Sequence, residues 1–151
     1  MSPTLKKVII GGTFDVLHKG HEVFLKKAFS LGDLTIGLTS DIMAEKAKKR
    51  KVRQFSERKK ELEKFIKKNL VKKTRIIKIE DKFGPTLEED FDYIVVSPAT
   101  HKTALLINKK RRKPMKIVEI KFVLAEDGKP ISASRIIKGR INKKGKLIRK
   151  N

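Results

Sequence analysis

The stretch LKKVIIGGTFDVLHKGH, residues 5–21, determines the predicted fold. The apolar-rich run from Leu5 to Ile10, followed by two glycines, predicts a buried β-strand with a sharp exit turn. From Gly20 onward, apolar residues recur at the three- and four-residue steps of a helix. Gly32 then stands where a helix C-terminal cap is expected. A strand that passes directly into a helix indicates an α/β protein.

The rest of the chain repeats this alternation of strand and helix. Further strands are predicted at residues 34–39, 75–79, 93–96 and 116–123. Helices are predicted within 41–51, over a segment capped by Ser56 with Leu62, Phe65, Ile66 and Leu70 as its apolar stripe, over 101–108, and from Ser132. This order predicts an α/β, doubly wound, mostly parallel five-stranded sheet with helices on both faces. Ligands of such sheets bind beyond the carboxyl ends of the strands.

Length and composition fit one compact domain. We assign residues 1–142 to that domain and expect the basic tail, 143–151, to pack poorly because it is so polar. The chain has no cysteine, which excludes disulfides and thiolate chemistry. It also has no apolar run long enough to span a membrane. We therefore expect a soluble, cytoplasmic protein, whose oligomeric state the sequence leaves open.

The charge balance favours anionic partners. There are 39 basic and 17 acidic residues, a net charge of +22. Phosphorylated metabolites, coenzymes and nucleic acids all fit such a charge. No RNP, KH or zinc-finger pattern accompanies it, and a single tyrosine offers few stacking platforms for bases. Specific nucleic-acid binding is therefore not expected, although a basic nucleic-acid-binding module remains the alternative from another functional class.

The segment GGTFDVLHKGH, residues 11–21, predicts a phosphate site. It joins a strand to a helix, where backbone N–H groups and the helix dipole favour an anion. Thr13 adds a hydroxyl donor. His18 and His21 are three residues apart, so their imidazoles should share one face of the helix start. We expect Gly20 to leave space between them for the ligand, and Asp15 to orient the loop by accepting backbone N–H bonds.

These residues suit adenylyl transfer to a phosphate acceptor. Such an acceptor is already an anion, so the reaction depends on positioning and on fixed donors for the developing charge. His18 and His21 are the predicted catalytic donors. A transition-metal site is not predicted, because His101 is the only other histidine and cysteine is absent. The Walker A and dinucleotide-binding patterns are both missing.

A second segment has similar properties. Ile131-Ser132-Ala133-Ser134-Arg135 precedes a predicted short helix, where hydroxyls and an arginine can hold an anion. With the first segment, it resembles the HxGH nucleotidyltransferase superfamily and its ISxTxxR signature. The resemblance implies a Rossmann-like nucleotidyltransferase fold and an ATP site made of Gly12, Thr13, Phe14, His18, Gly20, His21, Ser132, Ala133, Ser134 and Arg135.

The second motif departs from the family pattern at two positions. Ser134 replaces threonine, and Ile137 stands where the final arginine is expected. Arg135, Lys138 and Arg140 are the nearest cations that could take over its contact with the ATP phosphates, and the sequence does not choose among them.

Several intervening segments resemble the archaeal-type phosphopantetheine adenylyltransferases. They are AFSLGD at 28–33, IGLTSDIMA at 36–44, ER at 57–58 and IVVS at 94–97. The resemblance implies that ATP and 4′-phosphopantetheine give dephospho-coenzyme A and pyrophosphate, with Mg²⁺ accompanying ATP. Dephospho-coenzyme A or coenzyme A would then be a further ligand, as in coenzyme A biosynthesis.

The acceptor site is defined less closely by the sequence. Thr13 and Lys46 are the predicted acceptor-binding residues, Lys46 because it follows the second strand at the ligand-facing edge. Arg58 is interpreted as a helix surface residue or a loop anchor. A cytidylyltransferase or an FMN adenylyltransferase remains the alternative within the same superfamily. Both are less favoured, because the RTxGISTT arrangement and cysteines are absent.

Overall fold

The computed structural model describes residues 5–69 and 74–148, and its centre is a fully parallel five-stranded sheet. The strands are β1 (Lys7–Gly12), β2 (Asp33–Thr39), β3 (Arg75–Ile79), β4 (Tyr93–Val96) and β5 (Lys116–Glu119). Their order in the sheet is β3-β2-β1-β4-β5, so the chain reverses its direction of winding between β1 and β4. In an open α/β sheet, this switch point is where ligands bind, next to the carboxyl end of β1.

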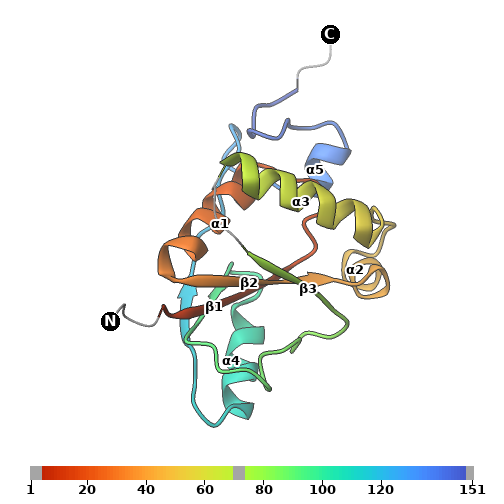
Figure 1. The fold of residues 1–151 in the computed structure, drawn as a ribbon. Coiled ribbons are helices and arrows are strands. Elements are labelled where there is room, and N and C mark those ends of the chain that lie inside the picture. The colour runs from red at the N-terminus through yellow and green to blue at the C-terminus, as the bar shows by residue number, and fades with distance from the viewer. Residues whose placement is uncertain (1–4, 70–73, 149–151) are drawn as a thin grey trace.

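Helices cover both faces of the sheet, as the sequence predicts (Figure 1). They are α1 (Lys19–Leu31), α2 (Asp41–Lys48), α3 (Phe55–Asn69), α4 (His101–Lys110) and α5 (Ala133–Ile137). On one face, α1 and α3 pack on a core that includes Val8, Ile10 and Val95. On the other face, α4 packs on Ile9 and Ile94. Neighbouring strand residues point to opposite faces, so both faces of the central strands are buried.

Two predicted elements differ in their bounds. Helix α3 begins at Phe55, so Ser56 lies inside it and the prediction that Ser56 caps this helix is wrong. Phe55 packs against the core, which draws the first turn one residue earlier. Strand β5 ends at Glu119 rather than at Val123. Leu70, predicted for the apolar stripe of α3, lies outside the described residues.

The chain beyond β5 forms a small C-terminal unit with its own apolar cluster. Ala125, Ile131 and Ile141 are buried together there, apart from the two main clusters. Ser132 caps α5 as predicted, by accepting a hydrogen bond from the Arg135 N–H. Figure 1 shows this unit beside the amino-terminal end of α1 and close to α3.

Backbone hydrogen bonds connect the tail to the rest of the chain. Residues 141 and 147 form an antiparallel bridge, and the Lys19 N–H donates to the Lys143 carbonyl at 2.9 Å. Backbone hydrogen bonds, rather than buried apolar side chains, therefore connect this segment to the rest of the chain. From 143 to 148 the residues are exposed except for Gly145, so poor packing of the tail stays a prediction, and residues 149–151 lie outside the described part of the chain.

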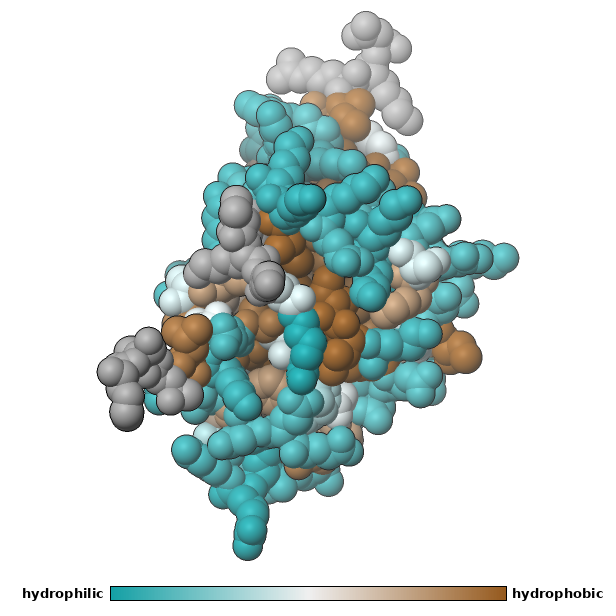
Figure 2. All heavy atoms as spheres, viewed as in Figure 1, coloured by the Kyte–Doolittle hydropathy of each residue, from teal (hydrophilic) through white to brown (hydrophobic). Residues whose placement is uncertain are grey.

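Charged and polar side chains cover most of the face seen in Figure 2, with apolar side chains visible mainly towards its middle. Within the described ranges, 5–69 and 74–148, no helix is both long and apolar enough to cross a bilayer.

Candidate active site at the start of helix α1

Two stacked imidazoles lie where β1 passes into α1. His18 is the N-cap of α1, and its Nδ1 accepts the Gly20 N–H at 3.0 Å. The His21 Nδ1 in turn accepts the His18 N–H at 3.3 Å. The ring centroids are 3.9 Å apart and the ring planes differ by 26°. The two imidazoles therefore share one face, as their spacing predicts, and form a reciprocal capping box.

These hydrogen bonds determine which ring nitrogen carries the proton. Because each Nδ1 accepts a backbone N–H, the proton of each neutral imidazole must sit on Nε2. Each ring then has one N–H donor, on the edge away from the backbone. A pair of fixed, neutral donors is suited to oxygens that gain negative charge during phosphoryl transfer.

The surroundings keep both rings neutral. Burial, together with the nearby Lys48 ammonium, lowers the pKa of His18 to about 4. Burial, His18 and Lys48 together lower the pKa of His21 to about 3. A ring that became fully protonated would also lose the backbone bond that its Nδ1 accepts. At neutral pH, both histidines are thus hydrogen-bond donors without a net charge.

This protonation state predicts a pH dependence that ¹⁵N NMR of the imidazoles can measure. Both rings should keep the tautomer with the proton on Nε2 from pH 8 to pH 5. The folded pKa values lie below the unfolded value, so the unfolded chain binds more protons as the pH falls below about 6.5. The free energy of unfolding should therefore decrease from pH 6.5 towards pH 4. A His101→Gln variant assigns the third resonance, and protonation of His18 and His21 near pH 6.5 would contradict this prediction.

The backbone at the helix start is less available than we expected. The Lys19 N–H is bonded to the Lys143 carbonyl, and the Gly20 N–H to the His18 ring. The idea that these N–H groups form a free anion cradle is therefore wrong for these two positions. At His18 and His21, the donors left for a ligand are the side-chain Nε2–H groups.

The glycines at positions 12 and 20 make room for neighbouring side chains. A Cβ on Gly20 would lie 2.8 Å from Cε1 of His18, so Gly20 is needed by the imidazole itself. A Cβ on Gly12 would lie 2.6 Å from Cε2 of Phe14. Phe14 has a φ of 47°, is buried and lies 5.0 Å from the His21 ring. The glycines thus allow the tight packing that orients the imidazoles.

Asp15 anchors the loop that follows α2. Its carboxylate accepts the Arg53 N–H at 3.2 Å, so it orients the loop after α2, and its orienting role within residues 11–21 stays a prediction. It also binds Arg50 Nη1 at 2.8 Å and Arg53 Nε at 3.2 Å. Burial alone would raise the pKa of Asp15, but the bonds from Arg50 and Arg53 hold it below its ordinary value. The sequence did not single out these two arginines, because they are 35 and 38 residues away.

Arg58 anchors the site from beneath. It is fully buried, so of the two interpretations the loop anchor holds and the helix surface residue is wrong. Its guanidinium donates to the carbonyls of Thr13 and Thr39, at 3.0 and 2.9 Å, and to the Asp41 carboxylate at 2.8 Å. The Thr13 and Thr39 hydroxyls are themselves 2.9 Å apart. One side chain therefore joins the carboxyl ends of β1 and β2.

The basic segment around the end of α2 brings a lysine charge close enough to act on the imidazoles. Lys48 acts on the pKa of both imidazoles, which places its charge near the site. Lys46 and Lys48 are both exposed on α2, and no contact between Lys46 and either imidazole is found among the described residues. The helical twist of α2 explains the difference, because residues two apart point to nearly opposite sides. The acceptor-binding role of Lys46 stays a prediction.

The second motif begins a short helix, as predicted, but its Arg135 side chain is bound by other protein groups. The Arg135 guanidinium binds the Asp127 carboxylate and donates to the Pro130 carbonyl at 3.0 Å. Ile137 is exposed at the end of α5. In the described part of the chain, no hydrogen bond or ion pair joins α5 to the imidazoles.

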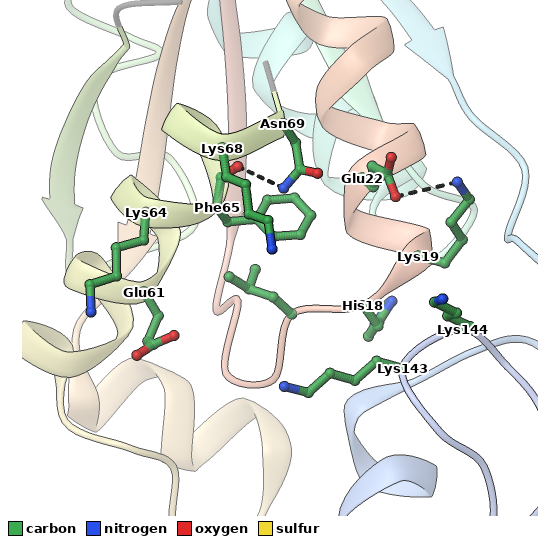
Figure 3. A pocket seen from close by; sticks show the side chains of 11 residues that line it. His18, Lys19, Glu22, Glu61, Lys64, Phe65, Lys68, Asn69, Lys143 and Lys144 are labelled. Carbon is green, nitrogen blue, oxygen red and sulfur yellow. Dashed lines mark hydrogen bonds and ion pairs between the residues drawn. The ribbon is translucent and has the colours of Figure 1, made fainter. Parts of the chain in front are cut away.

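A cavity of about 620 Å³ lies beside His18 (Figure 3). It is open to solvent and is bordered by the start of α1, by α3 and by the C-terminal unit. Its lining consists of Leu17, His18, Lys19, Glu22, Glu61, Lys64, Phe65, Lys68, Asn69, Lys143 and Lys144. A volume of this size suits a small organic ligand, and lysines outnumber carboxylates around it.

The sequence resembles known nucleotidyltransferases. The cytidylyltransferase-like family model matches residues 9–139. The phosphopantetheine adenylyltransferase of Methanosarcina mazei is 45% identical, over 95% of this chain and 97% of the relative. That of Archaeoglobus fulgidus is 43% identical, over 94% of this chain and 99% of the relative.

The solved structures agree on the fold. A protein described as of unknown function from Archaeoglobus fulgidus has a TM-score of 0.72 at 41% identity, over 76% of this chain and 88% of its own. A pantoate-β-alanine ligase from Francisella tularensis, 14% identical, has a TM-score of 0.58 over 91% of this chain and 67% of its own, which supports the fold alone. The chain therefore belongs to the cytidylyltransferase-like family, and within it to the archaeal-type phosphopantetheine adenylyltransferases.

Proposed function

We propose that this protein transfers the adenylyl group of ATP to 4′-phosphopantetheine, giving dephospho-coenzyme A and pyrophosphate in the cytoplasm. The observation that carries the proposal is the pair of neutral imidazoles with Nε2 donors at the start of α1. The names of the archaeal relatives support the choice of acceptor.

The proposed chemistry needs no covalent intermediate. An oxygen of the acceptor phosphate attacks the α-phosphorus of ATP, and the bond from that phosphorus to the bridging oxygen of pyrophosphate breaks. His18 and His21 would donate hydrogen bonds to the oxygens that gain charge. The acceptor is an anion, so no general base has to remove a proton from it. The low pKa values of both rings fit this role as donors rather than bases.

The acceptor phosphate needs a cation that offsets its repulsion from ATP. We assign this role to Lys48, whose charge already acts on both imidazoles. Thr13 would bind the same phosphate through its hydroxyl. Lys46, which the sequence suggested, is the alternative proposal; both lysines are exposed on α2, and Lys48 is the one that lowers the pKa of the imidazoles.

The remaining ATP contacts are proposed from the two motifs. Gly12, Phe14 and Gly20 would act by shaping the loop, and Ser132, Ala133 and Ser134 through the start of α5. Arg135 could reach a phosphate only by leaving Asp127, which it binds in this structure. We propose that ATP and Asp127 compete for this guanidinium.

Mg²⁺ would be brought by the nucleotide. In the part of the chain that the structure describes, no group of three or more histidine or carboxylate side chains could hold a metal ion. Asp15, the nearest buried carboxylate, is bound by Arg50 and Arg53. The donor set therefore does not fit a protein-built metal site. Phosphate oxygens and water are the ligands that Mg²⁺ usually takes with nucleotides.

A pyrophosphate-release assay tests the proposed reaction. With Mg²⁺ present, we expect turnover with ATP and 4′-phosphopantetheine, and much slower turnover with CTP, flavin mononucleotide or glycerol phosphate. Lys48→Ala should raise KM for phosphopantetheine about tenfold, because a charge-assisted hydrogen bond is lost. Lys46→Ala, on the same helix, is the comparison, and a rise in KM there but not in Lys48→Ala would return the acceptor role to Lys46. Turnover with CTP or flavin mononucleotide but not with this pair of substrates would overturn the proposed acceptor.

A further inference from the structure

The leaving pyrophosphate carries more negative charge than two neutral imidazoles can stabilise. Lysine or arginine side chains normally meet that demand in phosphoryl transfer. Around α5, the second motif supplies few of them. Ile137 is apolar and 53% exposed, and the Arg135 guanidinium is bound to Asp127 and Pro130.

The C-terminal unit brings other cations to the start of α1. The Lys143 carbonyl accepts the N–H of Lys19, the residue next to His18, at 2.9 Å. The turn that carries Lys143 is built by Asn142, whose Oδ1 accepts the Lys144 and Lys146 N–H groups at 2.9 Å each. Ile141, just before the turn, is fully buried. The backbone of this turn is therefore held against the catalytic helix.

The side chains of Lys143 and Lys144 share the wall of one cavity with His18. In Figure 3, Lys143 extends from the C-terminal unit along the cavity next to His18, and Lys144 lies beside the same ring. Neither lysine forms an ion pair with any carboxylate of the described residues, whereas Lys19 is paired with Glu22 at 3.3 Å. Both ammonium groups can therefore bind an anion that enters beside His18.

We propose that Lys143 and Lys144 bind the pyrophosphate end of ATP and supply the positive charge that the second motif lacks at Ile137. This inference rests on the proposed adenylyl transfer and adds two binding residues to it. The phosphate chain would then run from His21 past His18 to the C-terminal turn. The backbone hydrogen bond between Lys19 and Lys143 holds the turn that carries Lys143 and Lys144 next to the imidazoles.

Binding of pyrophosphate, measured by calorimetry in the presence of Mg²⁺, tests this proposal without turnover. The double variant Lys143→Ala/Lys144→Ala should bind pyrophosphate about 10- to 100-fold more weakly, because hydrogen bonds to a charged group are lost. AMP, which lacks the pyrophosphate, should bind with unchanged affinity. Lys121→Ala/Lys146→Ala removes the same charge at exposed positions outside the cavity and is the matched control.

Steady-state kinetics give a second readout. In the Lys143→Ala/Lys144→Ala variant, KM for ATP should rise while KM for phosphopantetheine stays constant, and Lys143→Arg/Lys144→Arg should restore most of the loss. Equal pyrophosphate affinity in this variant and the wild type would overturn the proposal, and so would an equal loss in the matched control. Absence of turnover by the wild type would instead reject the proposed reaction. The binding measurement would still show whether Lys143 and Lys144 bind pyrophosphate.

Discussion

Replacing His18 or His21 with alanine lowers kcat about 10²- to 10³-fold, if each imidazole is a fixed donor in the transition state. The reason is geometric. Each Nδ1 is bonded to a backbone N–H, so Nε2 is the single donor that each ring can offer. Without that N–H, the phosphate oxygens that gain negative charge in the transition state lose a hydrogen-bond donor that was already in position. Single-turnover measurements of pyrophosphate release give the effect on the chemical step.

The structural role of His18 requires a matched variant. His18 caps α1, so His18→Ala should also cost about 1 kcal/mol of unfolding free energy. Asparagine is a good N-cap residue but lacks the distal N–H of the ring, so His18→Asn should keep the stability and still lose the rate. Near-normal kcat in His18→Asn would show that the ring acts only as a cap.

Replacing Arg58 with methionine lowers the free energy of unfolding by about 3 kcal/mol, since it leaves buried acceptors without a partner. The Arg58 side chain is fully buried and satisfies the carbonyls of Arg53, Thr13 and Thr39. Methionine fills much of the volume but donates no hydrogen bond. Urea unfolding followed by circular dichroism measures the change.

The control for Arg58 is an arginine with a simpler environment. Arg75 is half exposed and pairs with Glu89 at 2.8 Å, so Arg75→Met should cost less than about 1 kcal/mol. Arg58→Met should also reduce kcat, because the loops after β1 and β2 lose their common anchor. A stability loss no larger than that of Arg75→Met would show that the network around Arg58 contributes little.

Much of the fold could be predicted because its signals are local. The strands at 75–79 and 93–96 match the observed bounds, and the predicted cap at Ser132 is present. Ser56 is the same residue type in a similar context, yet it lies inside α3. The difference comes from Phe55, which packs against the core and extends the helix by one residue. Residue preferences indicate where a helix can start, and packing against the core determines where it does start.

In the candidate site, too, some features could be predicted from local sequence and others required the folded structure. The spacing of His18 and His21 sufficed to place both rings on one face, because three residues make nearly one helical turn. The reason for Gly20 could not be read from the sequence. The space it leaves is taken by the His18 ring, which only the folded geometry shows.

By itself, the sequence determined the strand-to-helix segment and the parallel α/β sheet, and it predicted a phosphate site beyond β1. These follow from patterns that extend over a few neighbouring residues. The tertiary structure alone decided that Arg58 is buried beneath the site, that Lys48 acts on the imidazoles, and that Lys143 is bonded to the start of α1. The last of these joins residues more than a hundred positions apart. Such contacts depend on how the elements pack, and no local pattern of residues encodes them.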